Sequence, residues 1–384
     1  MAISPAQSDL LNFARWFAAW LVVAEHVRAL VFADYSTIQD ARLWLPFYLV
    51  TGFGHEAVMI FFVISGYLVG GKVWSTFAER RFRWKNYFCD RLSRLYAVLI
   101  AAMFIGLAFD TIGLRFFNGY GQYTNSSKTP LALVTRDFSE ALQPVDFISG
   151  LVFLQTVTSP PFGSNGPLWS LANEWWYYVL FPLCLAVLRE PRWLIKIVVF
   201  GVLIGLYLWL PTSMLVLGGV WLLGVCVAIV TNPLLSVWIT APATGIALLL
   251  ARMELFGSAI AQDYTIGLTF AFLINSMEGS SYRFPFRKLS FSLADFSYSL
   301  YLLHFPLILL AVSILHHQTG FGFKMPPGQK SVSLVVLLFI LAITFSWLVS
   351  LLTEKRTASI RAFFYSRLGL ELRTAGVSTQ RATE

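Results

Sequence analysis

Long apolar runs recur along this sequence from residue 13 to residue 353, separated by polar stretches of at most roughly fifty residues. The composition is 57% hydrophobic and only 12% charged, about half the charged fraction of an ordinary soluble domain. A helix of about twenty apolar residues crosses about 30 Å of hydrocarbon. The sequence therefore predicts an all-α fold, a polytopic membrane helix bundle of about ten transmembrane helices, at residues 13–33, 54–70, 94–113, 167–189, 193–210, 213–230, 235–252, 261–277, 294–315 and 331–353.

The loops between these runs differ in their content of lysine and arginine, which predicts how the helices are oriented. If the N-terminus lies in the cytoplasm, about 19 of the 28 Lys and Arg residues fall on the cytoplasmic side and about 7 on the outer side. This bias favours an integral membrane protein with both termini cytoplasmic.

Charge and cysteine content exclude several functional classes. The net charge of +8 follows from the loop bias and from contact with anionic membrane lipids, so no nucleic-acid partner is expected. The three cysteines, Cys89, Cys184 and Cys226, show no CxxC spacing, which excludes a disulfide framework and a cysteine metal site. The first apolar run contains Arg15 and His26, so it is expected to be a retained helix and not a cleaved signal peptide.

Two loops and the C-terminal end stand apart from the apolar runs. The inner loop 71–93 is basic and interleaved with aromatic residues, which is typical of a segment lying on anionic lipid. The outer loop 114–166 is polar and is the one long external region, where an acceptor molecule would be met. We expect a membrane domain over residues 1–356 and a basic cytoplasmic tail over residues 357–384.

The first apolar run carries ionisable groups that are costly inside a bilayer. Arg15 and His26 are eleven residues apart, which places both on one helix face and about 16 Å apart along the axis. This predicts an anchor near the inner membrane surface and a base deeper in the membrane. The alternative is that Arg15 reaches the interface and His26 makes a packing contact, while Glu25 and Arg28 are expected to pair with each other.

The second apolar run begins with a polar group at the predicted outer boundary. His55 and Glu56 lie there, and Glu56 is a candidate for binding a substrate, with an interfacial polar cap as the alternative for both residues. Ser65 and Gly66 are small residues that favour close helix contact, and no base at a fixed spacing supports Ser65 as a nucleophile.

Two further apolar runs carry candidate residues. Glu174 lies about one turn into the membrane, where a carboxylate must be paired or functional. Trp169 is five residues earlier and so on another face, and an aromatic belt is the alternative reading for it. His304 follows Tyr301 by about one helical turn near mid-membrane, where an interhelical hydrogen bond is the alternative to a substrate contact.

Five segments, in order along the chain, resemble the hallmarks of the acyltransferase-3 family of membrane acyltransferases, which modify polysaccharides and lipopolysaccharides. They are NFARWFAAWLVVAEH, GHEAVMIFFVISGYLVGG, YFCDRLSRLY, GPLWSLANEWWYYVLFPL and FSYSLYLLHFPL, and the likeness covers residues 9–356. The sequence departs from the family at Gly54-His55-Glu56, where an aromatic-glycine-acidic entry is more frequent, and no fused esterase-like domain is expected after the last apolar run.

The resemblance implies an O-acyltransferase of a bacterial cytoplasmic (inner) membrane. Its donor would be cytosolic acyl-CoA, expected to be acetyl-CoA, with no permanently bound cofactor. The acceptor would be a sugar or glycolipid hydroxyl at the outer side. The Arg-x10-His motif of the family matches Arg15 and His26, and its Arg-x-x-Arg motif matches Arg91 and Arg94.

The family's remaining motifs match Trp169, Glu174 and His304. Together with these matches, the residues predict three sets of site positions. The catalytic residues are expected to be His26, Arg15 and Glu174; the donor-binding residues Arg91, Arg94 and Arg15; and the substrate-binding residues Trp169, His304, Tyr301 and Glu56, with no metal ligand.

Other classes of protein fit part of the same pattern. A transporter or flippase of lipid-linked sugars also needs many helices and buried ionisable groups, but the sequence lacks paired broken helices and a two-fold repeat. A membrane scaffold would leave the buried charges unused. A haem protein using His26 and His304 would give a coloured preparation. The sequence does not predict the oligomeric state.

Overall fold

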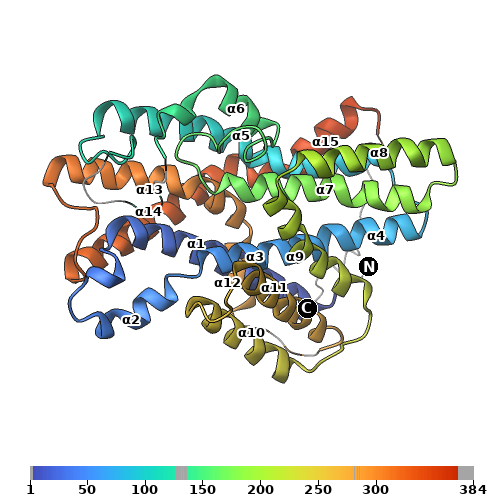
Figure 1. The fold of residues 1–384 in the computed structure, drawn as a ribbon, viewed down its shortest axis with the longest axis horizontal. Helices are drawn as coiled ribbons and strands as arrows, with labels where there is room; N and C mark the ends of the chain where they lie inside the picture. The colour runs from blue at the N-terminus through green and yellow to red at the C-terminus, as the bar shows by residue number, and fades with distance from the viewer. Residues whose placement is uncertain are drawn as a thin grey trace, which may run out of the picture.

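The computed structural model describes residues 3–126, 131, 133, 136–280, 282, 284 and 286–370. Within these residues all named elements are helical, which confirms the all-α class for this part of the chain. The long helices run side by side along the long axis of the bundle (Figure 1). Ahead of the C-terminal helix, the described residues form fourteen α-helices: α1 (Pro5–Val31), α2 (Ala41–Val50), α3 (Gly54–Ser65), α4 (Gly71–Ala78), α5 (Trp84–Phe116), α6 (Pro144–Leu151), α7 (Leu168–Arg189), α8 (Trp193–Trp209), α9 (Thr212–Ile229), α10 (Val237–Arg252), α11 (Ala259–Ser276), α12 (Arg287–Ala294), α13 (Ser297–Thr319) and α14 (Gln329–Leu352).

All ten predicted spans coincide with helices, but not all of these helices are equally suited to cross a membrane. Six stretches of the described residues are long and apolar enough, whereas α8 and α10 are shorter apolar helices. The number of spans and the side of each terminus stay predictions. Four of the cations that were counted for the orientation, Lys128, Arg283, Arg373 and Arg381, lie outside the described residues. The six stretches are Ala41–Ala78, Trp84–Phe116, Leu168–Arg189, Thr212–Ile229, Ser297–Thr319 and Gln329–Arg367.

Helix α1 lies inside the bundle, which explains how so polar a helix is tolerated. It packs against α3, α12, α13 and α14. The small residues Ala14, Ala18 and Ala19 are buried and let these neighbours approach closely. The ionisable residues of α1 therefore face protein and internal cavities, where partners are available.

Gly66 and Gly224 form a close crossing between the second apolar run and α9. Gly66 begins a π-helical segment, Gly66–Gly70, that joins α3 to α4. A methyl group on Gly66 would lie 1.9 Å from the carbonyl oxygen of Trp221, and one on Gly224 would lie 2.1 Å from the carbonyl oxygen of Val63. The prediction that Gly66 serves close helix contact is confirmed by this geometry.

Replacing Gly66 with alanine is expected to destabilise the folded protein by about 1–3 kcal/mol, because the backbones must separate to admit the methyl group. Thermal unfolding of purified protein in detergent would measure the change. The control is Gly201→Ala on α8, where no atom lies within 4 Å of the added carbon and alanine favours the helix. Equal melting temperatures for the two variants would contradict the close crossing.

The predicted outer loop 114–166 is largely folded into the bundle in its described part. α5 extends to Phe116, and α6 lies beyond it. Ser164 donates its backbone N–H and its hydroxyl to the Asp110 carboxylate at 2.7 and 2.6 Å, and Asn165 Nδ2 donates to the Leu302 carbonyl at 2.9 Å. Irregular backbone at this depth is tolerated because its polar groups find partners inside the protein.

Arg136 also holds this segment in place. Its guanidinium donates to the carbonyl oxygens of Pro161 and Gly163, the latter at 3.0 Å. Burial lowers the pKa of Arg136, and the nearby carboxylates of Asp146 and Asp110 oppose this shift. The segment that leads into α7 is thereby fixed, so the start of α7 lies inside the bundle and not at its surface.

Residues after the last apolar run form a further helix. α15 (Thr357–Arg367) packs against α5, and the Tyr365 hydroxyl donates to Asp90 Oδ1 at 3.0 Å. The first part of the predicted tail 357–384 is thus ordered against the bundle. Residues 371–384 lie outside the described residues, and the boundary at residue 356 stays a prediction.

Candidate active site

A cavity of about 410 Å³ lies between α1, α3, α5, α7 and α13. Both basic and acidic side chains line it, although α3 and α13 also contribute apolar walls such as Phe61 and Leu302. Charged groups are expensive inside a membrane protein, so their concentration here makes this cavity the candidate site. The ionisable lining residues are Arg15, Arg91, Arg94, Glu174, Asp295 and Glu354, together with Tyr178, Tyr298 and Tyr301.

Arg15 enters this cavity from α1. Among the described residues none forms a hydrogen bond or ion pair with its guanidinium, although the cavity also contains Glu174, Asp295 and Glu354. A guanidinium that carries five donors and faces a cavity is suited to bind an anion or a carbonyl oxygen of a ligand.

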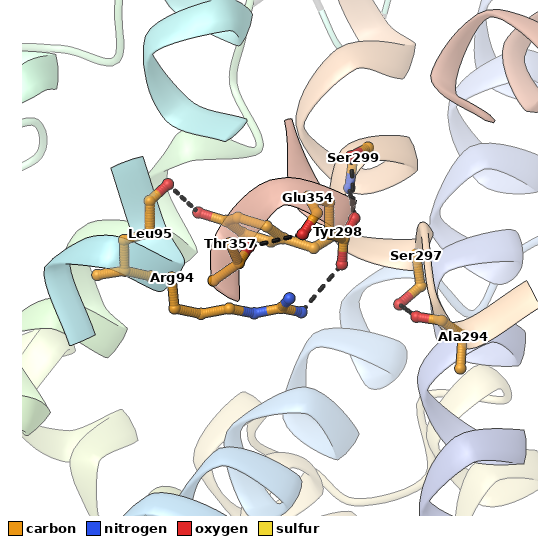
Figure 2. Close-up of polar contacts among 8 residues, drawn as sticks. All are labelled: Arg94, Leu95, Ala294, Ser297, Tyr298, Ser299, Glu354 and Thr357. Carbon is orange, nitrogen blue, oxygen red and sulfur yellow. Dashed lines mark hydrogen bonds and ion pairs between the residues drawn. The ribbon is translucent and has the colours of Figure 1, made fainter. Parts of the chain in front are cut away.

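Arg94 lies beside Arg15 but is bound by protein. Arg94 Nη2 donates to Glu354 Oε1 at 2.9 Å, and the other carboxylate oxygen of Glu354 accepts from the backbone N–H and the hydroxyl of Ser299, both at 2.9 Å (Figure 2). The Arg94 guanidinium also lies over the Tyr298 ring, 5.5 Å from its centre. The carboxylate therefore ties the end of α14 to the first turn of α13 and to α5.

Arg91 is one turn before Arg94 on α5 and has a different environment. Its guanidinium lies over the ring of Tyr178, 5.9 Å from the centre. Its Nε is buried and has no hydrogen-bond partner among the described residues. Of the three arginines that were predicted to bind the donor, Arg94 is bonded to Glu354, whereas no described residue bonds the Arg15 guanidinium or the buried Nε of Arg91.

Glu174 is held in a small hydrogen-bond network. Its Oε1 accepts from the Ser65 hydroxyl at 2.7 Å and from the Tyr178 hydroxyl, and Trp221 Nε1 donates to Ser65 Oγ at 3.1 Å. Ser65 thus has a polar role that its small size did not indicate. Trp169 does not line the cavity and packs edge-on against Phe62, so it lies on another face of α7 than Glu174, as expected.

His26 and His304 are joined directly, although 278 residues separate them. His26 Nδ1 lies 2.7 Å from His304 Nε2, and the two ring planes are nearly parallel, 13° apart, with their centres 5.0 Å from each other. His304 Nδ1 lies 3.1 Å from the Leu300 carbonyl oxygen and 2.9 Å from that of Tyr301. Since a carbonyl oxygen only accepts, Nδ1 of His304 carries the proton and its Nε2 accepts from His26.

This pattern fixes the tautomer of His26. With Nδ1 donating to His304, a neutral His26 ring keeps its free lone pair on Nε2. His26 retains some accessible surface, whereas His304 is fully buried. The pair therefore presents one imidazole nitrogen that can take up a proton, with the second ring holding the first in place.

The cavity and the histidine pair are neighbours but are not continuous in this structure. His26 does not line the cavity. The cavity wall near the histidine pair includes Phe61, Tyr301 and Leu302. The Tyr301 ring lies 6.2 Å from that of His304 and 5.6 Å from that of Phe61. A substrate that passes from the cavity to His26 must displace these side chains.

The polar groups at the start of α3 form a separate cluster. His55 Nε2 lies 2.7 Å from Asp263 Oδ1, and Gln262 Nε2 donates to Glu56 Oε1 at 3.0 Å. Asp263 and Gln262 were not among the candidate residues because nothing in the sequence links α11 to α3. Glu25 and Arg28 pair at 3.9 Å, as expected. Glu56 thus lies away from the cavity that Arg15, Arg91 and Glu174 line.

The helical bundle and its charged cavity define a class of protein, an integral membrane protein with a polar site enclosed by apolar helices. The chain belongs to the acyltransferase-3 family, because residues 9–351 match the model of that family, which is described as an acyltransferase domain. This confirms the resemblance noted in the sequence.

Two other comparisons add little to this assignment. An uncharacterized protein of Haemophilus influenzae is 26% identical over 154 residues, which cover 40% of this chain and 58% of that protein. No solved structure matches the chain.

Proposed function

We propose that the protein is a membrane O-acyltransferase. It takes an acyl group, expected to be acetyl, from cytosolic acyl-CoA and transfers it to a hydroxyl of a glycan or glycolipid at the outer side of the inner membrane. The observation that carries this proposal is the cavity lined by Arg15 and Arg91 that ends one layer of side chains from the His26–His304 pair. Family membership supports the reaction class.

The donor is proposed to lie along the cavity with its thioester towards Tyr301. Arg91 offers its unpaired guanidinium donors to the phosphates of CoA, which guanidinium groups bind well. Arg15 offers donors to the pantetheine arm, since it lies about 16 Å from His26 along α1. Arg94 acts here by holding Glu354 and so the shape of the cavity.

His26 is proposed to be the general base. Its Nε2 accepts the proton of the acceptor hydroxyl while the hydroxyl oxygen attacks the thioester carbon. The C–S bond then breaks, CoA leaves as the thiolate, and the proton held on His26 passes to the sulfur. His304 is a positioning residue, because it bonds His26 Nδ1 and not the substrate.

Glu174 and the outer polar groups complete the proposal. Glu174 lies with Ser65 and Tyr178 beside the cavity, where its carboxylate orients the donor. Glu56 and Trp169 are proposed to contact the acceptor. Tyr301 lines the cavity and neighbours His304, and it is proposed to contact the acyl group.

Replacing His304 with alanine is expected to lower kcat between about 10-fold and 10⁴-fold, the upper figure being that of an orienting residue in a serine-protease triad. His26 then loses the acceptor that holds its proton on Nδ1. Because His304 does not line the cavity, the KM for acyl-CoA should change little. A variant with wild-type kcat, or one that loses only donor affinity, would contradict the positioning role.

The proposal is tested with inverted membrane vesicles that contain the protein. Vesicles supplied with acetyl-CoA that is radiolabelled in the acetyl group should attach label covalently to a lipid or polysaccharide fraction, and vesicles without the protein should not. A transporter or flippase would move its substrate without covalent labelling, and that result would overturn the proposal.

A further inference from the structure

A second cavity of about 350 Å³ adjoins the first at the end of the bundle where α4 and α15 lie (Figure 1). The two cavities share Val69 and Arg91 in their walls. Arg91 therefore lines both cavities. The second cavity is formed by α4, the turn after it, the first turns of α5 and one face of α15.

Basic residues dominate this second cavity. Its ionisable lining side chains other than tyrosine are Lys72, Arg81, Arg83, Asp90, Arg91 and Arg361. Arg81 is paired with Glu79, and Asp90 accepts from Tyr365. Lys72, Arg83 and Arg361 form no ion pair within the part of the chain that the structure describes. Five cations thus face one carboxylate that is already bonded.

The contribution of α15 is the unexpected part of this site. The match to the family covers residues 9–351, so α15 lies beyond it. Tyr365 is buried and its hydroxyl lies within 3.4 Å of the Asn86 carbonyl oxygen and 3.0 Å of Asp90, both on α5. Arg361 is one turn earlier on the same helix, so this anchor fixes it at the cavity wall.

The chemistry of the lining fits a nucleotide that carries several phosphates. Exposed guanidinium and ammonium groups bind phosphate oxygens, and more than one of them is needed to neutralise such a ligand. The rings of Phe82 and Tyr87 also line the cavity and offer apolar surface for a purine base. An anionic lipid headgroup shares the phosphate chemistry but has no purine.

We propose that α15 is part of the donor site, and that Arg361 binds the phosphates of the adenine-nucleotide end of CoA together with Lys72 and Arg83. This inference rests on the proposed function. The nucleotide would occupy the second cavity, and the pantetheine arm would pass Arg91 into the first. The segment that the sequence assigns to a tail thereby gains a binding role.

The test compares Arg361→Gln with Arg367→Gln in the purified full-length protein. Arg367 is a matched control, because it is on the same helix and lies over the Phe363 ring without lining either cavity. Calorimetric titration with CoA is expected to show about 10- to 100-fold weaker binding for Arg361→Gln, as for a lost hydrogen bond between charged groups, and little change for Arg367→Gln. Acetyl-pantetheine, which lacks the nucleotide, should serve both variants and the wild type equally well as a donor.

Three results would overturn the inference. CoA binding by Arg361→Gln at the wild-type level, with acyl transfer intact, would remove α15 from the donor site and leave the proposed function standing. A loss confined to binding of phosphatidylglycerol vesicles would assign Arg361 to lipid. Absence of both CoA binding and acyl transfer in the wild type would refute the proposed function itself.

Discussion

Replacing His26 with glutamine is expected to lower the rate of acyl transfer by about 10²- to 10⁴-fold, the range that a general base contributes. Glutamine keeps a polar side chain that can still bond His304 Nε2, but it cannot take up a proton at the position of Nε2. Affinity for acyl-CoA should persist, since His26 does not line the donor cavity. Steady-state kinetics and CoA titration on the same preparation measure both quantities.

The matched control for this substitution is His317→Gln. His317 is exposed at the far end of α13, where its ring packs edge-on against Phe117. It should leave the rate unchanged. Full activity of His26→Gln would show that His26 takes no part in the reaction. If the variant instead failed to fold, its gel-filtration profile would change and its melting temperature would fall.

Replacing Glu354 with glutamine is expected to destabilise the fold by about 3 kcal/mol, the low end of the cost of breaking a buried ion pair. The Glu354 side chain is 2% exposed, and its carboxylate accepts hydrogen bonds from Arg94, the Ser299 hydroxyl and the Ser299 backbone N–H (Figure 2). Arg94 is 37% exposed, so water would partly solvate its unpaired charge. The loss of stability is therefore expected at the low end of the range for buried ion pairs. Thermal and denaturant unfolding in detergent measure the loss.

Asp295→Asn is the matched control for this carboxylate. Asp295 lies near the start of α13, is 49% exposed, and is 3.8 Å from Lys355. A pair of this kind contributes less than about 1 kcal/mol. Combining Glu354→Gln with Arg94→Met should recover part of the loss, because no unpaired cation remains. Strictly additive losses in the double variant would contradict the ion pair as the source of the effect.

The positions of the helices could be predicted from the sequence because apolar runs of membrane length are a strong local signal. The folding of the segment before α7 into the bundle could not. That segment is polar, and its partners Asp110 and Leu302 are distant in sequence, so no local pattern reveals them. α15 was also missed, since its docking depends on Tyr365 reaching Asp90.

The sequence predicted many of the residues that line the candidate site, but not the hydrogen bonds that join them. Arg15, Arg91, Arg94 and Glu174 do surround one cavity together with Tyr301. Helical spacing predicts a shared face for Arg15 and His26, but it could not pair His26 with His304, because helix packing determines that contact.

Glu354 was overlooked for a different reason. It stands between an apolar run and a basic stretch, where a carboxylate is ordinarily solvated. Its buried position beside Ser299 and Arg94 depends on where the end of α14 meets α5 and α13. The proposed donor path runs through both cavities towards the histidine pair, from which Tyr301 and Phe61 separate it.

A structure of the protein with a non-transferable acetyl-CoA analogue tests that path most directly. We expect the nucleotide phosphates beside Arg91 and the cations of the second cavity, with the acyl end beyond Arg15 and next to Tyr301 and His26. An analogue bound outside both cavities, or one with its acyl end turned away from His26, would contradict the account.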